Sequence, residues 1–489
     1  MNYAPSLTAI FVVVIATTNS FAQGYYSGTQ GARAAGRAGA FTAKADDLSA
    51  IELNPAGIAN IGMTVIQIGN RFSYNSYDFT RQATLDWGNV DSSGTPANVQ
   101  FATARNQKPW QYLDPMLGVV SNLGLKNWGF AFAAYAPAGI AKEQYADGGQ
   151  RYMMLSRDSQ ILNYTASVAW KYREVLGIGA SFLWISVPSL KYQLIINGNP
   201  LSRASSEDAV RSGTDMRATV SGSDPFTPNA VIGAWYRPAQ YLQWGLSAQV
   251  IPSDIRVKGN LSVDPVSDLG DQVVLKRNGI SANDVTLTLP LPIKVREGVR
   301  YRHIRGGREI FDIELDVAYE FWSRVQQLTL ESNGLRAKVL GVGVDVGRID
   351  IQKHWHNTIT IQLGSDYAVI PKVLTVRGGA FYISQLSDPA YTSIDFVSGR
   401  QVGGALGASI LAGSVEVAMA YEYRHQMPVS VSESESRVYQ QAPGSPCRPP
   451  YTVQSGCNVH YLGILAPVVN AGNYKAYSQV AAVDLLYRF

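Results

Sequence analysis

The most regular pattern of ionisable side chains in the sequence lies between residues 294 and 320. In the two segments 294–302 and 312–320, even-numbered positions carry four cations and four carboxylates: Lys294, Arg296, Arg300, Arg302, Asp312, Glu314, Asp316 and Glu320. Most odd-numbered positions between them are large and apolar, such as Val299, Tyr301, Ile313 and Leu315. Successive side chains of a strand point to opposite faces, so this alternation predicts two strands with one charged and one apolar face each. We interpret the charged faces as a structural ion-pair network in a polar lumen; a substrate site is the less favoured interpretation.

The spacing of these two segments limits how they can pair. If even-numbered residues share a face on both strands, directly opposed residues must have an even sum. In one allowed register the opposed pairs are Arg302–Asp312, Arg300–Glu314 and Lys294–Glu320; in the other they are Arg300–Asp312 and Arg296–Asp316. The same parity argues against a two-residue turn at Gly306-Gly307. It favours a loop of three or five residues centred on 305–307.

The other reactive side chains form no recognisable catalytic or metal-binding set. The five histidines are scattered, and His354 and His356 share a strand face without a third ligand. No Gly-x-Ser-x-Gly sequence is present, and the glycine-rich run 31–39 lacks the Gly-Lys-Ser/Thr that cradles phosphate. We therefore expect no enzymatic activity, no metal and no cofactor.

The N-terminus predicts export. Residues 7–16 form an apolar run too short to span a bilayer as a helix, and small residues precede a cut after Ala22. Residues 1–6 contain no Lys or Arg, which departs from the usual pattern. We interpret residues 1–22 as a signal peptide, with a buried N-terminal strand as the alternative.

The two cysteines, Cys447 and Cys457, lie in a segment rich in Pro, Gly and Ser. In an exported protein this spacing favours a disulfide within one loop. Closing about 11 residues contributes roughly 3 kcal/mol in the chain-entropy model. A metal site is less favoured because only His460 is near enough to add a ligand.

Composition narrows the class of protein. Only 16% of the 489 residues are charged, 46% are hydrophobic and 27 are Tyr, whereas about 25% of a typical soluble chain is charged. A mean hydropathy of −0.04 argues against several membrane helices. A formal charge of +4 gives no reason to expect nucleic acid as a partner. A membrane barrel fits, because its apolar outer face and polar lumen average to near zero.

Segments with a period of two continue from residue 62 to the C-terminus. They number about fourteen: 62–80, 114–124, 127–137, 151–172, 174–190, 216–238, 241–257, 281–303, 308–325, 353–368, 371–386, 399–412, 413–427 and 474–489. Short links (near 124–127, 237–241, 304–308, 368–371 and 412–413) alternate with long ones (near 81–113, 190–215, 258–280, 326–352, 387–398 and 428–473). This asymmetry is typical of outer-membrane barrels. We therefore expect residues 62–489 to form an all-β, antiparallel transmembrane barrel, as a monomer, in the outer membrane of a Gram-negative bacterium.

Residues 23–61 differ, being rich in Gly and Ala, with helix formers and Asn54-Pro55. The run Gly31 to Ala40, the pair Asp46-Asp47 and then Asn54-Pro55-Ala56 resemble the outer-membrane long-chain fatty-acid and hydrocarbon transporter family (FadL/TodX type). Segments 316–323 and 374–382 and the aromatic end Tyr487-Arg488-Phe489 are also similar. The resemblance implies that residues 23–61 form a small helical hatch that plugs the lumen. It also implies recognition of Phe489 by the barrel assembly machinery.

This resemblance further implies passive uptake of hydrophobic small molecules, captured between extracellular loops, bound in the lumen and released laterally through the wall. Long-chain fatty acids are the first expectation; aromatic hydrocarbons, or a general porin or adhesin, are the alternatives. The candidate substrate-binding residues are Arg33, Phe41, Leu53, Leu194, Ile196, Leu261 and Val263.

Gating is expected of the hatch residues Asp46, Asp47, Asn54, Pro55 and Ala56. Asp46 and Asp47 are expected to anchor the hatch to lumen arginines, and Asn54 to cap a turn. A lateral opening is expected near Pro137 and Gly139, because proline cannot donate to a strand ladder. An ordinary strand end at Pro137 is the equal alternative.

Overall fold

The computed structural model describes residues 30–90, 96–137, 140–197, 215–266, 274–339, 342–346, 348–397, 399–440 and 468–489. The predicted signal peptide, Gly139, Cys447 and Cys457 lie outside these ranges, so the cleavage site and the disulfide stay predictions. Within the described ranges, no helix has the length and apolar character needed to cross a membrane.

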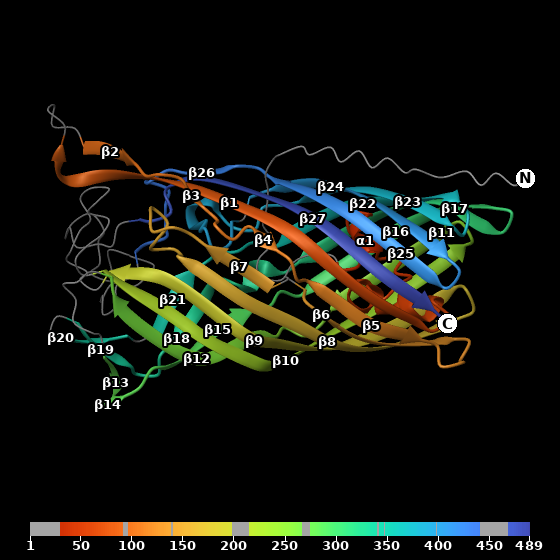
Figure 1. The fold of residues 1–489 in the computed structure, drawn as a ribbon, viewed down its shortest axis with the longest axis horizontal. Coiled ribbons are helices and arrows are strands. Elements are labelled where there is room, and N and C mark those ends of the chain that lie inside the picture. The colour runs from red at the N-terminus through yellow and green to blue at the C-terminus, as the bar shows by residue number, and fades with distance from the viewer. Residues whose placement is uncertain are drawn as a thin grey trace, which may run out of the picture.

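Fourteen antiparallel strands form a closed barrel, as the alternating pattern predicted (Figure 1). Each wall strand pairs with the next, and β1 pairs with β27 to close the ring. The wall strands are β1 (Val65–Val90), β5 (Pro115–Ser121), β6 (Trp128–Tyr135), β8 (Ser156–Tyr172), β9 (Leu176–Asn197), β10 (Asp215–Ala239), β11 (Leu242–Gln249), β16 (Lys294–Arg305), β17 (Arg308–Glu320), β22 (Thr358–Ile370), β23 (Leu374–Ile383), β24 (Gln401–Ala412), β25 (Val415–Gln426) and β27 (Gly472–Arg488).

Shorter strands extend the wall at the end with the long connections. They are β2 (Pro96–Gln100), β3 (Ala104–Arg105), β4 (Trp110–Gln111), β7 (Ile140–Gln144), β12 (Asp254–Pro265), β15 (Asp284–Pro290), β18 (Gln327–Glu331), β21 (Arg348–Gln352) and β26 (Val429–Val431). A separate sheet of β13 (Leu275–Arg277), β14 (Ile280–Ser281), β19 (Arg336–Val339) and β20 (Val342–Asp345) lies beyond them, and two short 3-10 helices, η3 (Trp322–Arg324) and η4 (Pro389–Tyr391), join strands. Leu194, Ile196, Leu261 and Val263 therefore lie in strands β9 and β12 rather than in the expected loops. In these extended strands the backbone N–H and C=O groups form hydrogen bonds with the neighbouring strand. In an isolated loop the same groups would have to form hydrogen bonds with water.

The hairpin of β16 and β17 shows the predicted alternation. Its register places Arg302 opposite Asp312 and Lys294 opposite Glu320, one of the two registers that parity allows. The expected three- or five-residue loop is wrong: Arg305 pairs with Arg308 across a two-residue turn at Gly306-Gly307, both with positive φ. A bulge after His303 supplies one extra residue, which changes the parity between the turn and the strands.

The segment 285–301 is not one strand with one apolar face, as its odd-numbered apolar residues had suggested. Val299 and Tyr301 of β16 are exposed on the outer wall, whereas Leu287 and Leu289 of β15 are buried on the inside. The ladder breaks after Pro290, and β16 begins at Lys294. Pro290 and Pro292 cannot donate to a ladder, so the chain restarts with its inner and outer faces exchanged.

A plug and cavities in the barrel lumen

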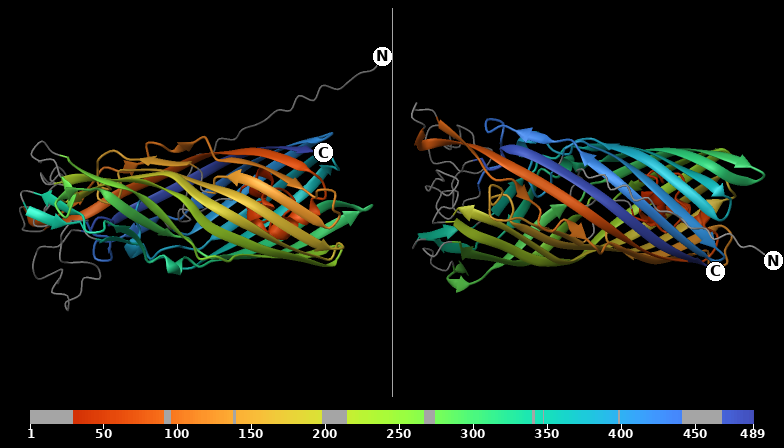
Figure 2. Two further views of the ribbon diagram at one scale, coloured as in Figure 1. Left: turned by 90° about the horizontal axis from the view of Figure 1, so that it is seen from below. Right: turned by 45° about the horizontal axis from the view of Figure 1, so that its top comes forward.

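The N-terminal residues 30–61, which we call the plug, fold inside the barrel near the end that carries the C-terminus (Figure 2). They form α1 (Ala32–Ala35), α2 (Ala50–Leu53) and η1 (Pro55–Asn60), and nearly all of their side chains are buried. Glycines of the wall make room for the plug. A Cβ at Gly233 would lie 2.1 Å from Asn54 Oδ1, and one at Gly245 would lie 2.5 Å from the Thr42 carbonyl oxygen. Small residues on both surfaces therefore allow this close packing.

Carboxylates of β17 hold the backbone of the plug. Asp316 Oδ2 accepts hydrogen bonds from the amides of Phe41 and Thr42 at 2.9 and 2.8 Å. Glu314 Oε1 accepts one from the amide of Ala43 at 2.6 Å. A carboxylate that accepts backbone N–H bonds makes stronger bonds than a neutral acceptor does, so β17 fixes residues 41–43 in place.

Two buried cations of the plug complete this network. Arg37 Nη1 lies 2.6 Å from both Asp312 Oδ1 and Asp366 Oδ1, and its Nη2 lies 3.0 Å from Glu314. Lys44 Nζ lies 2.6 Å from Asp312 Oδ2. Asp312, Glu314 and Asp366 are thus paired with cations, as buried charges require, and these contacts support the structural interpretation of the charged strand faces.

Contrary to expectation, the acidic pair of the plug forms its ion pairs with Arg33 of the plug, and within the described ranges it forms none with an arginine of the wall. Asp46 Oδ1 lies 2.8 Å from Arg33 Nη2 within the plug. Asp47 Oδ1 accepts a hydrogen bond from the amide of Ser49 at 2.9 Å and lies farther, at 3.7 Å through Oδ2, from Arg33. The plug folds back on itself, so its own arginine meets the pair before a wall residue can.

The two acids also differ in pKa. Burial would raise the pKa of Asp46, but the charges of Arg33 and Lys44 outweigh it and lower that pKa below its ordinary value. Burial dominates at Asp47 and raises its pKa, because Arg33 is too distant to offset it.

Asn54, Pro55 and Ala56 form the turn that the sequence suggested. Asn54 Oδ1 accepts a hydrogen bond from the Ala56 amide at 3.2 Å, and its Nδ2 donates to the carbonyl oxygens of Thr42 and Ala234. The Trp235 indole donates to the Ala56 carbonyl oxygen at 3.0 Å. These residues therefore fasten the plug to β10.

Three candidate substrate-binding residues lie in the plug and, in the described part of the chain, line no apolar cavity; Arg33 lines a polar cavity and lies 3.7 Å from Glu416 of β25. Phe41 and Leu53 cluster with Ala34, and Phe41 is fully buried. The guanidinium groups of Arg33 and Arg37 lie 5.9 and 5.8 Å from the centroid of the Phe41 ring.

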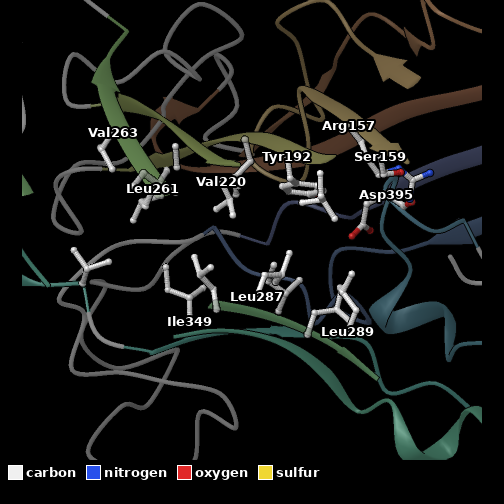
Figure 3. A pocket seen from close by; sticks show the side chains of 18 of the residues that line it. Arg157, Ser159, Tyr192, Val220, Leu261, Val263, Leu287, Leu289, Ile349 and Asp395 are labelled. Carbon is white, nitrogen blue, oxygen red and sulfur yellow. The ribbon is translucent and has the colours of Figure 1, made fainter. Parts of the chain in front are cut away.

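The other four candidates line one apolar cavity of about 100 Å³ in the extended part of the barrel (Figure 3). Leu194 and Ile196 reach it from β9, and Leu261 and Val263 reach it from β12. Sequence reasoning missed its further aliphatic lining, which includes Val220, Leu287, Leu289, Leu330 and Ile349. Leu287 and Leu289 are buried because odd-numbered residues face inward before Pro290 and outward after it. The alternation of apolar residues in the sequence did not show this change.

Polar groups gather at one end of this apolar cavity, where Figure 3 shows Arg157, Ser159 and Asp395 beside Tyr192. Arg157 forms an ion pair with Glu143 and donates to the Asp395 carbonyl oxygen at 3.2 Å. Lys353 Nζ lies 2.6 Å from Asp395 Oδ2. These residues come from separate segments, so no local motif could have revealed them.

Another polar cavity lies between the wall and Ala38 of the plug, and we call it the lumen chamber. Its charged lining is Lys294, Arg296, Glu320, Glu422 and Arg424. Lys294 pairs with Glu320 at 2.6 Å, and Arg424 pairs with Glu422 at 2.7 Å. Arg296 is only 8% exposed, and among the described residues no carboxylate lies within 4.0 Å of it.

The wall beside the plug is interrupted near Pro137. Pairing of β6 with β8 ends at Tyr135–Asn163 and resumes in β7 at Ile140–Gln160. Gln30 Nε2 of the plug donates to the Ala136 carbonyl oxygen at 2.7 Å. The start of the plug thus contacts the interruption directly.

Comparisons with known proteins agree with this architecture. The family described as outer membrane protein transport protein (OMPP1/FadL/TodX) matches residues 13–460. No curated protein matches the sequence. Across the described part of the chain, no three His, Cys, Asp or Glu side chains are grouped so as to hold a metal ion.

Solved structures share the fold at low sequence identity. A Pseudomonas aeruginosa FadL homologue has a TM-score of 0.69 at 16% identity, covering 96% of this chain and 100% of that one. The Pseudomonas putida toluene transporter TodX has a TM-score of 0.59 at 14% identity, covering 94% and 98%. The Ralstonia pickettii toluene transporter TbuX has a TM-score of 0.58 at 13% identity, covering 95% and 99%. The chain therefore belongs to the OMPP1/FadL/TodX family of outer-membrane proteins that transport hydrophobic compounds.

Proposed function

We propose that this protein takes up long-chain fatty acids by passive diffusion across the outer membrane. The observation that carries the proposal is the shape of the apolar cavity, which is aliphatic along its length and polar at one end only. A molecule with a long hydrocarbon tail and one polar head matches that distribution, because each part meets a surface of its own polarity.

The lumen chamber supplies a second reason to favour an acid. A carboxylate that enters it would meet Arg296, which lacks an acidic partner within ion-pair distance among the described residues. Lys294 and Arg424 are already paired there with Glu320 and Glu422. Arg296 can therefore bind an incoming carboxylate without first breaking an ion pair.

The plug lies across the direct path from this chamber to the end with the short turns. We propose lateral exit at the wall interruption between Tyr135 and Ile140, with Gln30 of the plug as the contact that must be lost. A plug that occupies the lumen also makes a general porin less favourable, because a porin must conduct water and ions.

Aromatic hydrocarbons are the second candidate, because TodX and TbuX are described as toluene transporters. A neutral hydrocarbon would use the apolar cavity but would gain nothing from Arg296. Uptake of labelled oleate and of labelled toluene should be measured in cells with and without this protein. We expect oleate uptake to depend on the protein; dependence of toluene uptake alone would reject the fatty-acid proposal, and dependence of neither would reject transport.

We also propose that Phe489 is read by the barrel assembly machinery. Its side chain is 68% exposed, while its amide donates to the Thr64 carbonyl oxygen at 3.0 Å. The backbone of the last residue is thus held in place, and its ring remains available for recognition.

A further inference from the structure

Two groups of charged residues on the outer wall share one arrangement, in which a carboxylate lies between two cations on three adjacent strands. Asp78 of β1 is opposite Arg105 of β3 on one side and Lys475 of β27 on the other. Asp158 of β8 is likewise opposite Lys142 of β7 and Lys191 of β9. We call these six residues the two outer triplets.

Each triplet has an excess of positive charge. Arg105 Nε lies 3.4 Å from Asp78 Oδ2, and Lys142 Nζ lies 2.9 Å from Asp158 Oδ2. The Arg105 side chain is 75% exposed and that of Lys142 is 56% exposed. Lys475 and Lys191 are exposed too, and neither forms an ion pair within the described residues. One carboxylate cannot neutralise two cations, so each triplet attracts a further anion.

The aromatic residues of the wall show how deep in the membrane the outer triplet of Asp78, Arg105 and Lys475 lies. Tyr477, on the same face as Lys475, contacts Tyr74, which contacts Trp110, with ring centroids 5.2 and 4.9 Å apart. Tyr487 packs on Phe489 near the other end of β27. The stretch from Tyr477 to Tyr487 rises roughly 25 Å at about 3.4 Å per residue and a tilt near 45°, which equals the height of a barrel's apolar band. Lys475 therefore lies just beyond the aromatic girdle, at the level of outer-leaflet headgroups.

We propose that the outer triplets bind the phosphate groups of an outer-leaflet lipid. Exposed cations at headgroup level attract anionic headgroups, and lysine and arginine both bind phosphate. The two triplets lie on strands of the wall that Figure 1 labels β27, β1 and β3 and then β7, β8 and β9. This inference does not depend on which substrate is transported.

The test uses purified full-length protein in detergent and two double variants, Arg105→Gln with Lys475→Gln and Lys142→Gln with Lys191→Gln. Bisphosphorylated lipid A, the same lipid without phosphates, and inorganic phosphate are titrated and binding is followed by native mass spectrometry. We expect bisphosphorylated lipid A to bind most tightly and each double variant to weaken it by about tenfold or more, since each removed cation weakens binding several-fold.

Lys126→Gln is the matched control, because it removes one exposed cation in the short turn between β5 and β6, at the opposite end of the barrel. This variant should bind as the unmodified protein does. Heat-dependent migration on gels checks that each variant has a folded barrel. Equal binding of lipid with and without phosphates, unchanged binding by both double variants, or equal binding of inorganic phosphate would overturn the proposal.

Discussion

Arg37 of the plug and Asp312 of β17 lie 2.6 Å apart between Nη1 and Oδ1, and both side chains are fully buried. The same guanidinium contacts Glu314 and Asp366, so one plug residue forms ion pairs with carboxylates on two wall strands. The position of the plug in the lumen is thus set by charge pairing as well as by the close fit of small residues.

Replacing Arg37 with Met should loosen the plug. Removing one partner of a buried ion pair leaves uncompensated charge and costs about 3–5 kcal/mol. Planar-bilayer recordings should show a larger ion conductance than the unmodified protein. Lys126→Met, in an exposed turn, should leave the conductance unchanged, and an unchanged conductance for Arg37→Met would contradict the role assigned to this network.

The acidic pair of the plug should respond unequally to neutralisation. Asp46 has a lowered pKa, so its contribution to stability is present at neutral pH and is lost as pH falls through the folded-state pKa. Asp46→Asn should therefore lower the stability of the folded protein at pH 7. The loss should be less than about 1 kcal/mol because the side chain is partly exposed, and it should vanish in acid.

Asp47 has a raised pKa, so its contribution to the stability of the fold is complete in acid and is lost as pH rises through the folded-state pKa. Asp47→Asn should leave stability at pH 7 unchanged or raise it. Thermal unfolding in detergent at pH 7 and at about pH 2, below the ordinary pKa of an aspartate, measures both variants. A larger loss at pH 7 for Asp47→Asn than for Asp46→Asn would refute this assignment.

Arg296→Gln should weaken the binding of fatty acids and leave the binding of hydrocarbons unchanged. Losing a charge-assisted hydrogen bond costs about 1.5–3 kcal/mol, which is about tenfold or more in oleate affinity. Competition with a fluorescent fatty acid measures this loss, and Arg296→Lys, which keeps the charge, should recover much of the affinity. Toluene binding should not change; equal losses for oleate and toluene would argue against a carboxylate at Arg296.

Leu287→Trp should obstruct the apolar cavity and lower uptake of any hydrophobic substrate several-fold. Leu287 lines the cavity from β15, whereas Leu315 of β17 is 49% exposed on the outer wall. Leu315→Trp is therefore the matched control and should transport normally. Uptake that is unaffected by Leu287→Trp would mean that substrates bypass this cavity.

Local patterns predicted the wall strands well because the side-chain period of a strand is a property of neighbouring residues. Alternation at 294–302 and 312–320 was enough to assign the inner face and to reduce the β16–β17 register to two choices. It could not predict the two-residue turn at Gly306-Gly307, because one extra residue in a bulge reverses the parity on which the argument depended.

The residues of the apolar cavity and the contacts of the plug were harder to predict from the sequence. Leu194, Ile196, Leu261 and Val263 were selected as apolar residues, yet the cavity that unites them also needs Arg157 and Asp395 from distant segments. Similarly, nothing near Asp46 indicated whether its partner would be Arg33 of the plug or an arginine of the wall.

The amino-acid sequence alone therefore determined the barrel class and the alternation of wall strands, because strand period is local in origin, whereas the N-terminal plug was expected from the family resemblance. Only the tertiary structure decided which carboxylates hold the plug, where Pro290 exchanges the inner and outer faces, and which side chains form the cavities. Those relationships join residues far apart in the chain, and they exist only once the ring of strands has closed and set each side chain at a definite height and on a definite face.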